Sequence, residues 1–446
     1  MSTPVTGNQD FFYNNRFIHD FRQASPYIHH FNGKTLVLAI SSHVLVSDKL
    51  AALAADILLL TSLGMRLVII HGCSQFIRAI ADCHTAISID ENPVTDEAAL
   101  RLVKQACGIA RFDLEAALSM MPTQVMDHSI PNVRISSGNF LRAKPLGVIN
   151  GIDMGYSGSV RKVDAVTIEE HLARNQLVLI SPIGHSLSGQ SYRLPVNEVA
   201  QAVSEAINAE KLIFLGTQQG ILDEQQQTIS KLNCIEIRQL LARNIPDKRQ
   251  TELLQTAVHV LEHGVQRVHV LSGLHDGSLL LELFTREGSG TAMAKAPFMR
   301  IRPAENKDIG EILQLIAPLE AAGILLPRDS EYMENHIHEF SVLEQDCYVY
   351  GCVALHVYLQ EKAGELACLI VSPNARTRGY GELLLSHVIK QAQELQLQVL
   401  FALSTNTGDW FIERGFTSAT LAQLPLKRQQ QYTSNKRQSK IFRRQL

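Results

Sequence analysis

The sequence lacks the features that mark membrane proteins and nucleic-acid-binding proteins. Its longest apolar runs, such as ILLL (57–60), fall far short of the roughly 20 residues that span a bilayer. The first residues, MSTPVTGNQDFFYNNRF, contain no apolar signal core. A formal net charge of −3 and a pI of about 6.6 provide no excess of positive charge for a nucleic acid or an anionic membrane surface. We therefore expect no nucleic-acid partner and no membrane partner.

Cysteine is scarce and scattered. The seven cysteines are an odd number, and none has the spacing of a metal-ligand motif: Cys73, Cys83, Cys107, Cys234, Cys347, Cys352 and Cys368. This pattern predicts reduced thiols in the cytoplasm rather than a disulfide framework, and it indicates no metal. With 446 residues, 46% of them hydrophobic and 19% charged, the chain is typical of a soluble globular protein with two or more domains.

Apolar strands alternate with amphipathic helices through much of the chain. TLVLAI (35–40) and KLIFLG (211–216) are typical of buried strands, and the segment 48–64 predicts a helix that ends at Gly64. Such alternation predicts a mostly parallel sheet with helices on both faces. Residues 1–32 form a polar and aromatic N-terminal arm, and we expect its helix to stop near Pro26.

The alternation breaks at GSGTAMAKAPFM, which is rich in glycine and alanine and has no strong period. We interpret residues 288–298 as a linker between a first domain, residues 33–287, and a second domain, residues 299–446. In the second domain, the strand GELACLIV (364–371) is followed by a glycine-containing loop, a helix and the strand VLFALST (399–405).

The loop NARTRGYG (374–381) leads directly into the helix ELLLSHVIKQAQEL. The first N–H groups of a helix have no internal partner, and the macrodipole makes that end positive. Glycines allow an anion to approach the backbone closely, and Arg376 and Arg378 add positive charge. We interpret the loop as a phosphate cradle. The alternative is a surface turn with solvated arginines.

Two motifs of the second domain resemble those of a known family. The sequence Arg-Thr-Arg-Gly-Tyr-Gly precedes the helix, and STNTGDWFIERGF (404–416) follows the next strand. In this order they resemble the GNAT family of N-acetyltransferases. The resemblance implies an α+β domain with a mixed sheet and acetyl-CoA as the co-substrate. It assigns the pyrophosphate to Arg376, Thr377, Arg378, Gly379, Tyr380 and Gly381.

Acetyl transfer to an amine requires a base, an oxyanion site and a proton for the leaving thiolate. Glu365 is a candidate base, acting directly or through a water, and Ser404 can protonate the thiolate of coenzyme A. The alternatives are a solvated turn carboxylate and an ordinary serine at a strand end. The family resemblance places the thioester carbonyl at the backbone N–H groups around Cys368, Leu369, Ile370 and Val371. Cys368 itself is interpreted as a packed residue rather than a nucleophile.

Nearly the whole chain, from Phe21 to Phe442, resembles the bacterial N-acetylglutamate synthase family. Matching segments include SGNFLRAKPLGVINGIDMGYSGSVRKVD (137–164) and IAPLEAAGILLPR (316–328). The resemblance implies an amino-acid-kinase-like three-layer sandwich with a mostly parallel sheet, joined to the acetyltransferase domain, and L-glutamate as acceptor. It assigns glutamate binding to Leu326, Arg328, Arg437 and Ser439. Arginines suit a dicarboxylate because they form bidentate pairs.

The first domain lacks the glycine-rich phosphate loops of an active kinase, because Ser41-Ser42 and His71-Gly72-Cys73-Ser74 stand in their places. A kinase-like domain that lacks these phosphate-binding loops is more consistent with a regulatory role than with a catalytic one. The resemblance implies L-arginine as an effector and a homo-oligomer, by analogy a hexamer. It assigns arginine binding to Tyr27, His269, Glu282 and Gly288.

These observations predict a cytoplasmic, metal-independent amino-acid N-acetyltransferase that catalyses the first step of arginine biosynthesis under feedback by arginine. Two alternatives stay open. One is a non-catalytic arginine sensor with a degenerate acetyltransferase domain, because two positive charges of the family are missing at Ala317 and within 328–331. The other is N-acetylglutamate kinase, which the lost glycines disfavour.

Overall fold

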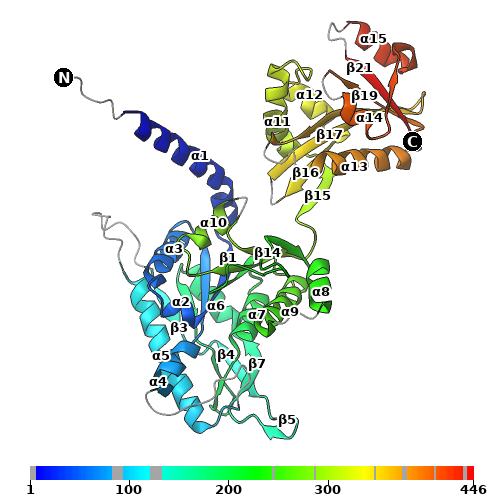
Figure 1. Ribbon diagram of the computed structural model, residues 1–446. Helices are drawn as coiled ribbons and strands as arrows, with labels where there is room; N and C mark the ends of the chain where they lie inside the picture. Colours follow the sequence, from blue (N-terminus) through cyan, green and yellow to red (C-terminus); the bar gives the residue numbers. More distant parts are fainter. Residues whose placement is uncertain are drawn as a thin grey trace, which may run out of the picture. The chain divides into compact units, whose positions relative to one another are not determined.

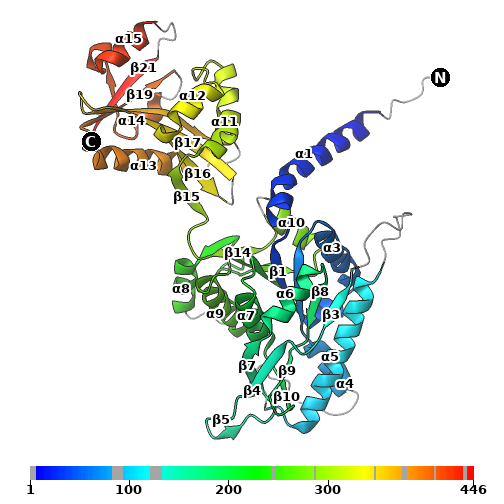
Figure 2. The same cartoon turned by 180° about the vertical axis from the view of Figure 1, so that it is seen from behind.

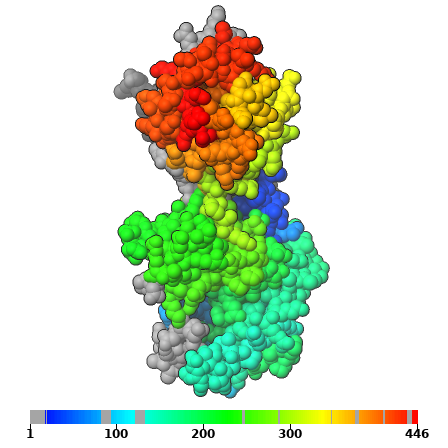
Figure 3. Space-filling model, turned by 90° about the vertical axis from the view of Figure 1, so that its right-hand side faces the viewer, coloured from blue at the N-terminus to red at the C-terminus, as the bar shows by residue number. Residues whose placement is uncertain are grey.

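The structure is a computed structural model, and it describes residues 7–82, 94–120, 133–243, 247–285, 288–345, 348–373, 379–405, 408–434 and 439–446. The chain divides into two units, of which the first extends to Ala296 and the second begins at Pro297. Figures 1 and 2 show a sheet covered by helices in each unit, and Figure 3 shows cyan and green residues gathered in one body and orange and red residues in the other. No helix in the described ranges combines the length and apolar character needed to cross a membrane.

An eight-stranded sheet forms the centre of the first unit. Neighbouring strands are parallel except for the antiparallel pair β13 and β14. In spatial order the strands are β12 (Lys231–Asn233), β14 (Thr291–Ala294), β13 (Arg267–Ser272), β11 (Lys211–Gly216), β1 (Thr35–Ile40), β2 (Arg66–His71), β8 (Leu177–Ile180) and β3 (Ile135–Ser137). Most are continuous apolar runs, as expected for a sheet buried on both faces.

Helices cover both faces of this sheet and bury two separate cores. In β1, Val37 and Ala39 belong to one core, and Leu36, Leu38 and Ile40 belong to the other. The first core includes side chains of α6 (Ala165–Ala173), α7 (Val196–Ala206), α8 (Cys234–Ala242) and α9 (Lys248–Glu262). The second includes side chains of α1 (Gly7–Phe31), α2 (Ser42–Leu45), α3 (Leu50–Ser62), α4 (Ser74–Asp82), α5 (Glu97–Leu118) and α10 (Ser278–Phe284).

A smaller four-stranded sheet completes the first unit. Its spatial order is β10 (Ser191–Arg193), β9 (Ile183–His185), β4 (Leu141–Pro145) and β7 (Gly158–Val163). The hairpin of β5 (Val148–Ile149) and β6 (Ile152–Asp153) lies between β4 and β7 in the chain.

The second unit has a seven-stranded mixed sheet. In spatial order the strands are β15 (Met299–Pro303), β16 (Phe340–Gln345), β17 (Tyr348–Tyr358), β18 (Ala363–Val371), β19 (Val399–Ser404), β21 (Lys440–Gln445) and β20 (Thr417–Ala419). Only β18 and β19 pair in parallel among these described strands. The two sheets confirm the predicted fold class, a mostly parallel α/β sandwich followed by an α+β domain.

Helices also cover both faces of the second sheet. Side chains of α13 (Tyr380–Glu394) and α14 (Gly408–Ile412) pack in one core, and those of α11 (Ile309–Ala321) and α12 (Ser330–His336) pack in another. The helix α15 (Leu426–Ser434) precedes β21, and Tyr432 of this helix packs against a third, smaller core. Short 3-10 helices occupy Asn306–Asp308, Ile337–Glu339 and Leu421–Gln423.

The strand β14 contradicts part of the predicted linker 288–298. Thr291–Ala294 are buried and pair with β13 on one side and β12 on the other. A short strand that is buried on both faces has no alternation of apolar and polar residues, so its pattern is easily mistaken for that of a linker. The linker prediction is therefore wrong for these residues, and the first unit extends to Ala296.

The helix α1 continues through Pro26, where the sequence predicted a stop. Proline has no N–H to donate within a helix, and in the interior it costs about 3 kcal/mol or more. The end of α1 is anchored nevertheless, because Phe31 is 4% exposed within the second core and Tyr27 packs against that core. Tertiary packing thus outweighs the local cost of the proline.

Gly290, which precedes β14, provides a test of this buried placement. A Cβ at this position would lie 2.3 Å from the carbonyl oxygen of Val270 and 2.9 Å from that of Gln219. We expect Gly290→Ala to lower the free energy of unfolding by about 1–3 kcal/mol in urea titrations. Gly108→Ala is the control, because a Cβ in α5 meets no atom within 4 Å, and it should raise stability by about 0.5–1 kcal/mol. Unchanged stability of Gly290→Ala would contradict the placement.

Candidate active site

The strands β18 and β19 part halfway along β18. Their parallel pairing runs from Ala363 opposite Val399 to Leu366 opposite Ala402. Beyond that point the described pairing of β18 is with β17 alone, and its register shifts between Cys352 and Ala354. Cys368 adopts a φ of 49°, in the left-handed region that is uncommon for a residue with a side chain. This bulge interrupts the register with β17 at Cys368 and Leu369, just beyond the point where the pairing with β19 ends.

Side chains around the bulge pack into the two cores, so the backbone is what the opening presents. Cys368 and Ile370 belong to the core beneath α11 and α12, whereas Leu369 and Val371 pack against the core beneath α13. Cys368 is 4% exposed. This packing agrees with the interpretation of Cys368 as a buried small residue.

The helix α13 begins directly after a glycine in the left-handed conformation. Gly379 is its N-cap with a φ of 74°, and Tyr380 and Gly381 form the first turn. The ring of Tyr380 is buried and packs edge-on against the ring of Tyr350, with centroids 6.2 Å apart. This turn can therefore bind a ligand through its backbone N–H groups rather than through the phenol. Arg376, Thr377 and Arg378 of the predicted phosphate cradle lie outside the described residues.

A cavity of about 60 Å³ lies beside the parting strands. It brings together residues that are far apart in the sequence, and its lining is Leu325, Leu326, Arg328, Glu365, Leu366, Ala367, Cys368, Leu403, Arg428, Tyr432 and Ser439. Five of these were predicted as site residues: Leu326, Arg328, Glu365, Cys368 and Ser439. Arg437, the remaining predicted glutamate-binding residue, lies outside the described residues.

Glu365 is buried in this cavity and is held by an arginine. Arg428 donates from Nε to Oε2 at 2.8 Å and from Nη2 to Oε1 at 2.9 Å, and the hydroxyl of Tyr358 donates to Oε2 at 3.3 Å. The side chains of Arg428 and Glu365 are 15% and 7% exposed. A bidentate pair in this environment fixes the orientation of the carboxylate. Sequence reasoning missed Arg428, although the basic segment LKRQQQYTS was visible.

Arg328 offers hydrogen-bond donors to the same cavity. Its Nη1 donates to the carbonyl oxygen of Leu326 at 3.1 Å, and its guanidinium lies 5.7 Å from the ring centre of Tyr332. Among the residues that the structure describes, its Nε is buried without a hydrogen-bond partner. Burying an unpaired donor is unfavourable, so this guanidinium is suited to bind a further acceptor.

The C-terminal strand forms another wall of the cavity. Ser439 is 7% exposed, and its carbonyl oxygen accepts a hydrogen bond from the hydroxyl of Tyr432 at 2.6 Å. Leu403 lines the cavity, whereas Ser404, the last residue of β19, does not. Because side chains alternate along a strand, Ser404 lies on the face of Leu400 and Ala402, which pack against the core beneath α13.

A second group of predicted residues lies in the first unit. His269 Nδ1 donates to Glu282 Oε1 at 2.6 Å, and Lys211 Nζ lies 3.1 Å from His269 Nε2. The other oxygen of Glu282 accepts from the N–H groups of Ser289 at 2.6 Å and Gly290 at 3.1 Å. A neutral imidazole thus bridges an ammonium and a carboxylate.

Gly288 and Tyr27 complete the predicted set. A Cβ on Gly288, whose φ is 70°, would lie 2.5 Å from Glu282 Oε2, so the glycine permits the turn that encloses the carboxylate. Tyr27 belongs to α1, which contacts α10, the helix that carries Glu282. Three of the four predicted residues therefore adjoin one another, and Tyr27 lies on a neighbouring helix.

The helices α2 and α4, which follow β1 and β2, contact each other through the serines at their starts. Ser42 Oγ lies 2.8 Å from Ser74 Oγ and accepts from the N–H of Gln75 at 3.1 Å. A Cβ on Gly72 would lie 2.9 Å from the nitrogen of Ser42, which shows how closely the two segments approach. The hydroxyl groups of Ser42 and Ser74, which could otherwise face a phosphate, contact each other instead. This arrangement disfavours kinase activity.

Comparisons with known proteins agree with both units. Residues 34–272 match the amino acid kinase family, and residues 309–410 match the acetyltransferase (GNAT) family. The amino-acid acetyltransferase of Neisseria meningitidis serogroup A is 45% identical over 432 residues, which cover 96% of this chain and 98% of the relative. That of Pasteurella multocida is 38% identical over 431 residues, which cover 95% of this chain and 97% of the relative.

Two crystal structures of N-acetylglutamate synthase from Neisseria gonorrhoeae are also similar. The complex with coenzyme A and L-arginine is 43% identical and has a TM-score of 0.89. The complex with coenzyme A and N-acetyl-glutamate is 44% identical and has a TM-score of 0.61. Each match covers 96% of this chain and 99% of the other.

The fold and the site define an acyltransferase in which a GNAT unit follows an amino-acid-kinase-like unit. The chain belongs to the amino-acid acetyltransferase family, whose members include the N-acetylglutamate synthase of Neisseria gonorrhoeae. The predicted family and the predicted enzyme class are thereby confirmed.

The buried cluster of the first unit predicts a pH-dependent stability. Burial and the charge of Lys211 lower the pKa of His269 to about 4 from 6.5. Burial alone would raise the pKa of Glu282, but hydrogen bonds from His269, Ser289 and Gly290 outweigh it and lower that pKa to about 2 from 4.5. Both shifts mean that the unfolded chain binds more protons, so stability falls as the pH falls from about 6.5 towards 2.

The contribution of His269 to the pH dependence of stability can be separated from that of Glu282 by substitution. Its lowered pKa corresponds to a loss on the order of 3 kcal/mol between pH 6.5 and 4. In His269→Asn, whose amide can still donate to Glu282, urea unfolding should depend less on pH across this window. The exposed His275 supplies the control, because His275→Gln should retain the full dependence. An unaltered pH slope in His269→Asn would contradict the assignment.

Proposed function

We propose that the chain is an N-acetylglutamate synthase, which transfers the acetyl group of acetyl-CoA to the α-amine of L-glutamate. One observation carries this proposal: Glu365, Arg328 and Ser439 surround a single cavity where β18 and β19 part. Support comes from the similar Neisseria gonorrhoeae enzyme, which has been crystallised with coenzyme A and N-acetyl-glutamate. The proposal includes a cytoplasmic location, the first step of arginine biosynthesis and a homo-oligomer, by analogy a hexamer.

Acetyl-CoA would bind with its pyrophosphate at the first turn of α13. The unpaired N–H groups and the positive dipole end of a fifteen-residue helix suit an anion, and the left-handed Gly379 leads the chain into that turn. Arg376, Thr377, Arg378, Tyr380 and Gly381 would contribute side-chain or backbone donors. The thioester would then extend to the backbone of Cys368, Leu369, Ile370 and Val371.

The cavity residues are proposed to bind and activate glutamate. Arg328, whose buried Nε has no hydrogen-bond partner among the described residues, would bind one carboxylate. Arg437 and Ser439 would bind the other, with Leu326 contributing its backbone. Glutamate arrives mainly as an ammonium, because free α-amines titrate near pH 8. The ionised carboxylate of Glu365, oriented by Arg428, would take the proton directly or through a water.

The reaction then proceeds by direct attack, without an acyl-enzyme. The amine nitrogen forms a bond to the acetyl carbon, and the carbonyl oxygen gains negative charge that backbone N–H groups at the bulge stabilise. Collapse of this intermediate breaks the carbon–sulfur bond. At collapse the attacking nitrogen loses its second proton. Ser404 would protonate the thiolate of coenzyme A and regain a proton from the one that the nitrogen loses, by way of solvent. Glu365 releases the proton that it took from the ammonium to solvent after the products leave. The chemistry requires no metal ion.

Release of coenzyme A across a panel of amino acids tests the proposal. We expect glutamate to give the highest kcat/KM. A chain that releases no coenzyme A with glutamate, while still binding arginine, would favour the alternative of a non-catalytic sensor. ATP-dependent phosphorylation of N-acetylglutamate would favour the kinase.

Glu365→Gln tests the proposed base. We expect the turnover number to fall by about 10²- to 10⁴-fold, because general base catalysis is lost, while coenzyme A binding measured by calorimetry stays unchanged. Glu334→Gln, an exposed carboxylate on α12, is the control and should retain full turnover.

The same substitution also breaks a buried ion pair, which typically costs about 3–5 kcal/mol because one charge is left uncompensated. The double variant Glu365→Gln/Arg428→Gln removes both charges and should recover much of the thermal stability without recovering turnover. Recovery of turnover together with stability would assign Glu365 a structural role only and would refute its role as base.

L-Arginine is proposed as a feedback effector that binds at Glu282, His269, Gly288 and Tyr27. An ionised carboxylate offers about four acceptor positions, and three are used at Glu282, so one remains for a guanidinium. The Neisseria gonorrhoeae enzyme crystallised with L-arginine supports this proposal. Arginine would change activity by binding one arrangement of the protein more tightly than another.

Glu282→Gln should weaken arginine binding at least 30-fold in calorimetry, because truncating one side of a buried charge pair costs about 2 kcal/mol or more. Activity without arginine should persist, since Glu282 lies in the first unit. The exposed Glu169 on α6 is the matched control, and Glu169→Gln should bind arginine normally. Unchanged arginine affinity in a folded Glu282→Gln protein would exclude this site.

A further inference from the structure

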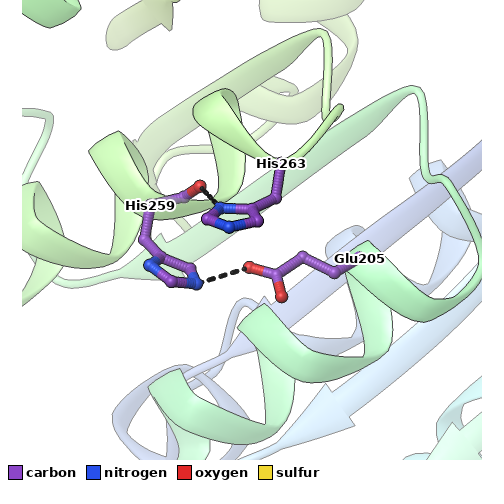
Figure 4. Close-up of side chains that lie close together, drawn as sticks. All are labelled: Glu205, His259 and His263. Atoms are coloured by element: carbon purple, nitrogen blue, oxygen red, sulfur yellow. Dashed lines mark hydrogen bonds and ion pairs between the residues drawn. The ribbon is translucent and has the colours of Figure 1, made fainter.

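Two histidines and a glutamate converge on the surface of the first unit. Glu205 lies in the last turn of α7, His259 lies in the last turn of α9, and His263 caps the end of α9 (Figure 4). One ligand atom from each side chain lies within 4.8 Å of the others. His259 and His263 are four residues apart, the spacing that presents two imidazoles on one face of a helix.

The contacts within this cluster leave donor atoms available for a cation. His259 Nε2 lies 3.3 Å from Glu205 Oε1, and the two imidazole rings stack with centroids 4.2 Å apart. His263 Nδ1 lies 2.7 Å from the carbonyl oxygen of His259 (Figure 4), so Nδ1 carries the proton. In the neutral ring Nε2 therefore presents a lone pair, and the backbone contact orients it as outer partners orient metal-ligating histidines.

Glu205 supplies a second observation. Its Oε1 is buried, and apart from the contact with His259 it forms no hydrogen bond of suitable geometry with the residues that the structure describes. A buried carboxylate oxygen with so little hydrogen bonding is unfavourable, and a cation would satisfy it. The surroundings also favour positive charge, because α7 and α9 both end here and the C-terminal end of each helix dipole is negative.

We propose that Glu205, His259 and His263 form a binding site for a divalent transition-metal cation, with Zn²⁺ the best match. Two imidazoles and one carboxylate are ligands that zinc prefers, and one water would complete a tetrahedron. Mg²⁺ and Ca²⁺ are disfavoured because they select oxygen ligands. Ligand distances of about 2.0–2.2 Å place two donors at most about 4.4 Å apart, so the exposed imidazoles tilt slightly inward on binding.

The ion would join two helices rather than catalyse hydrolysis. The residues HVLEH (259–263) place Glu262 where some zinc peptidases hold a catalytic glutamate. Here Glu262 forms an ion pair with Arg238 of α8. Both α7 and α9 pack in the same core on one face of the eight-stranded sheet. Binding at their ends therefore links two elements of one core and stabilises the first unit.

Calorimetry with the full chain, free of coenzyme A, tests the site. We expect one Zn²⁺ per chain and a rise in the temperature of unfolding on its addition, with no binding of Mg²⁺. Co²⁺ should produce the visible absorption bands of a four-coordinate site with nitrogen ligands. The double variant His259→Gln/His263→Gln should bind Zn²⁺ at least 100-fold more weakly, and His275→Gln, an exposed histidine of the same unit, should bind normally.

Glu205→Gln provides a second variant with both histidines intact. It should weaken Zn²⁺ at least tenfold and alter the Co²⁺ spectrum, while circular dichroism confirms that it is folded. Zn²⁺ affinity and stoichiometry that are unchanged in both variants would place the ion elsewhere and overturn the proposal. The result is independent of acetyl transfer, because no residue of this cluster belongs to the second unit.

Discussion

The end of the parallel pairing between β18 and β19 is the constraint on which the rest of the second unit depends. The two strands hold together up to Leu366 and Ala402, and the left-handed Cys368 then turns β18 away. Ala367 and Cys368, just beyond this point on β18, line the cavity around Glu365, and α13 packs against the same strand. A residue in an uncommon backbone conformation is maintained here because both of its neighbouring cores are well packed.

The first unit retains a kinase-like sheet, but the segments that follow its strands β1 and β2 contact each other. Serines after β1 and β2 satisfy one another, whereas the interior charge is concentrated at Lys211, His269 and Glu282. Burying such a chain of polar groups is favourable only when each member is paired. The pairing holds α10 and the start of β14 to the central strands, so a ligand that competes for Glu282 would act on a junction of several elements.

Much of the fold could be predicted from the sequence, and the exceptions have physical causes. Continuous apolar strands and capped helices identify the layers, because both faces of the first sheet are buried. The strand β14 was not predicted, because its small residues are buried on both faces and show no hydrophobic period. The helix α1 continues through Pro26, because the burial of Phe31 outweighs the cost of a proline inside a helix. Family motifs predicted five of the eleven residues that line the cavity, but they did not predict Arg428. It lies 63 residues from Glu365, and only the folded chain makes them partners.

One consequence concerns protection of the enzyme from its own substrate. A reactive thiolate beside a bound thioester could capture the acetyl group by transthioesterification. Cys352 lies on β17 next to the bulge, with its sulfur 3.7 Å from the carbonyl oxygen of Cys368. Burial raises the pKa of the Cys352 thiol well above its usual range, so the sulfur stays protonated and poorly nucleophilic. If the thioester binds at the bulge as proposed, the burial of Cys352 would protect the enzyme from self-acetylation.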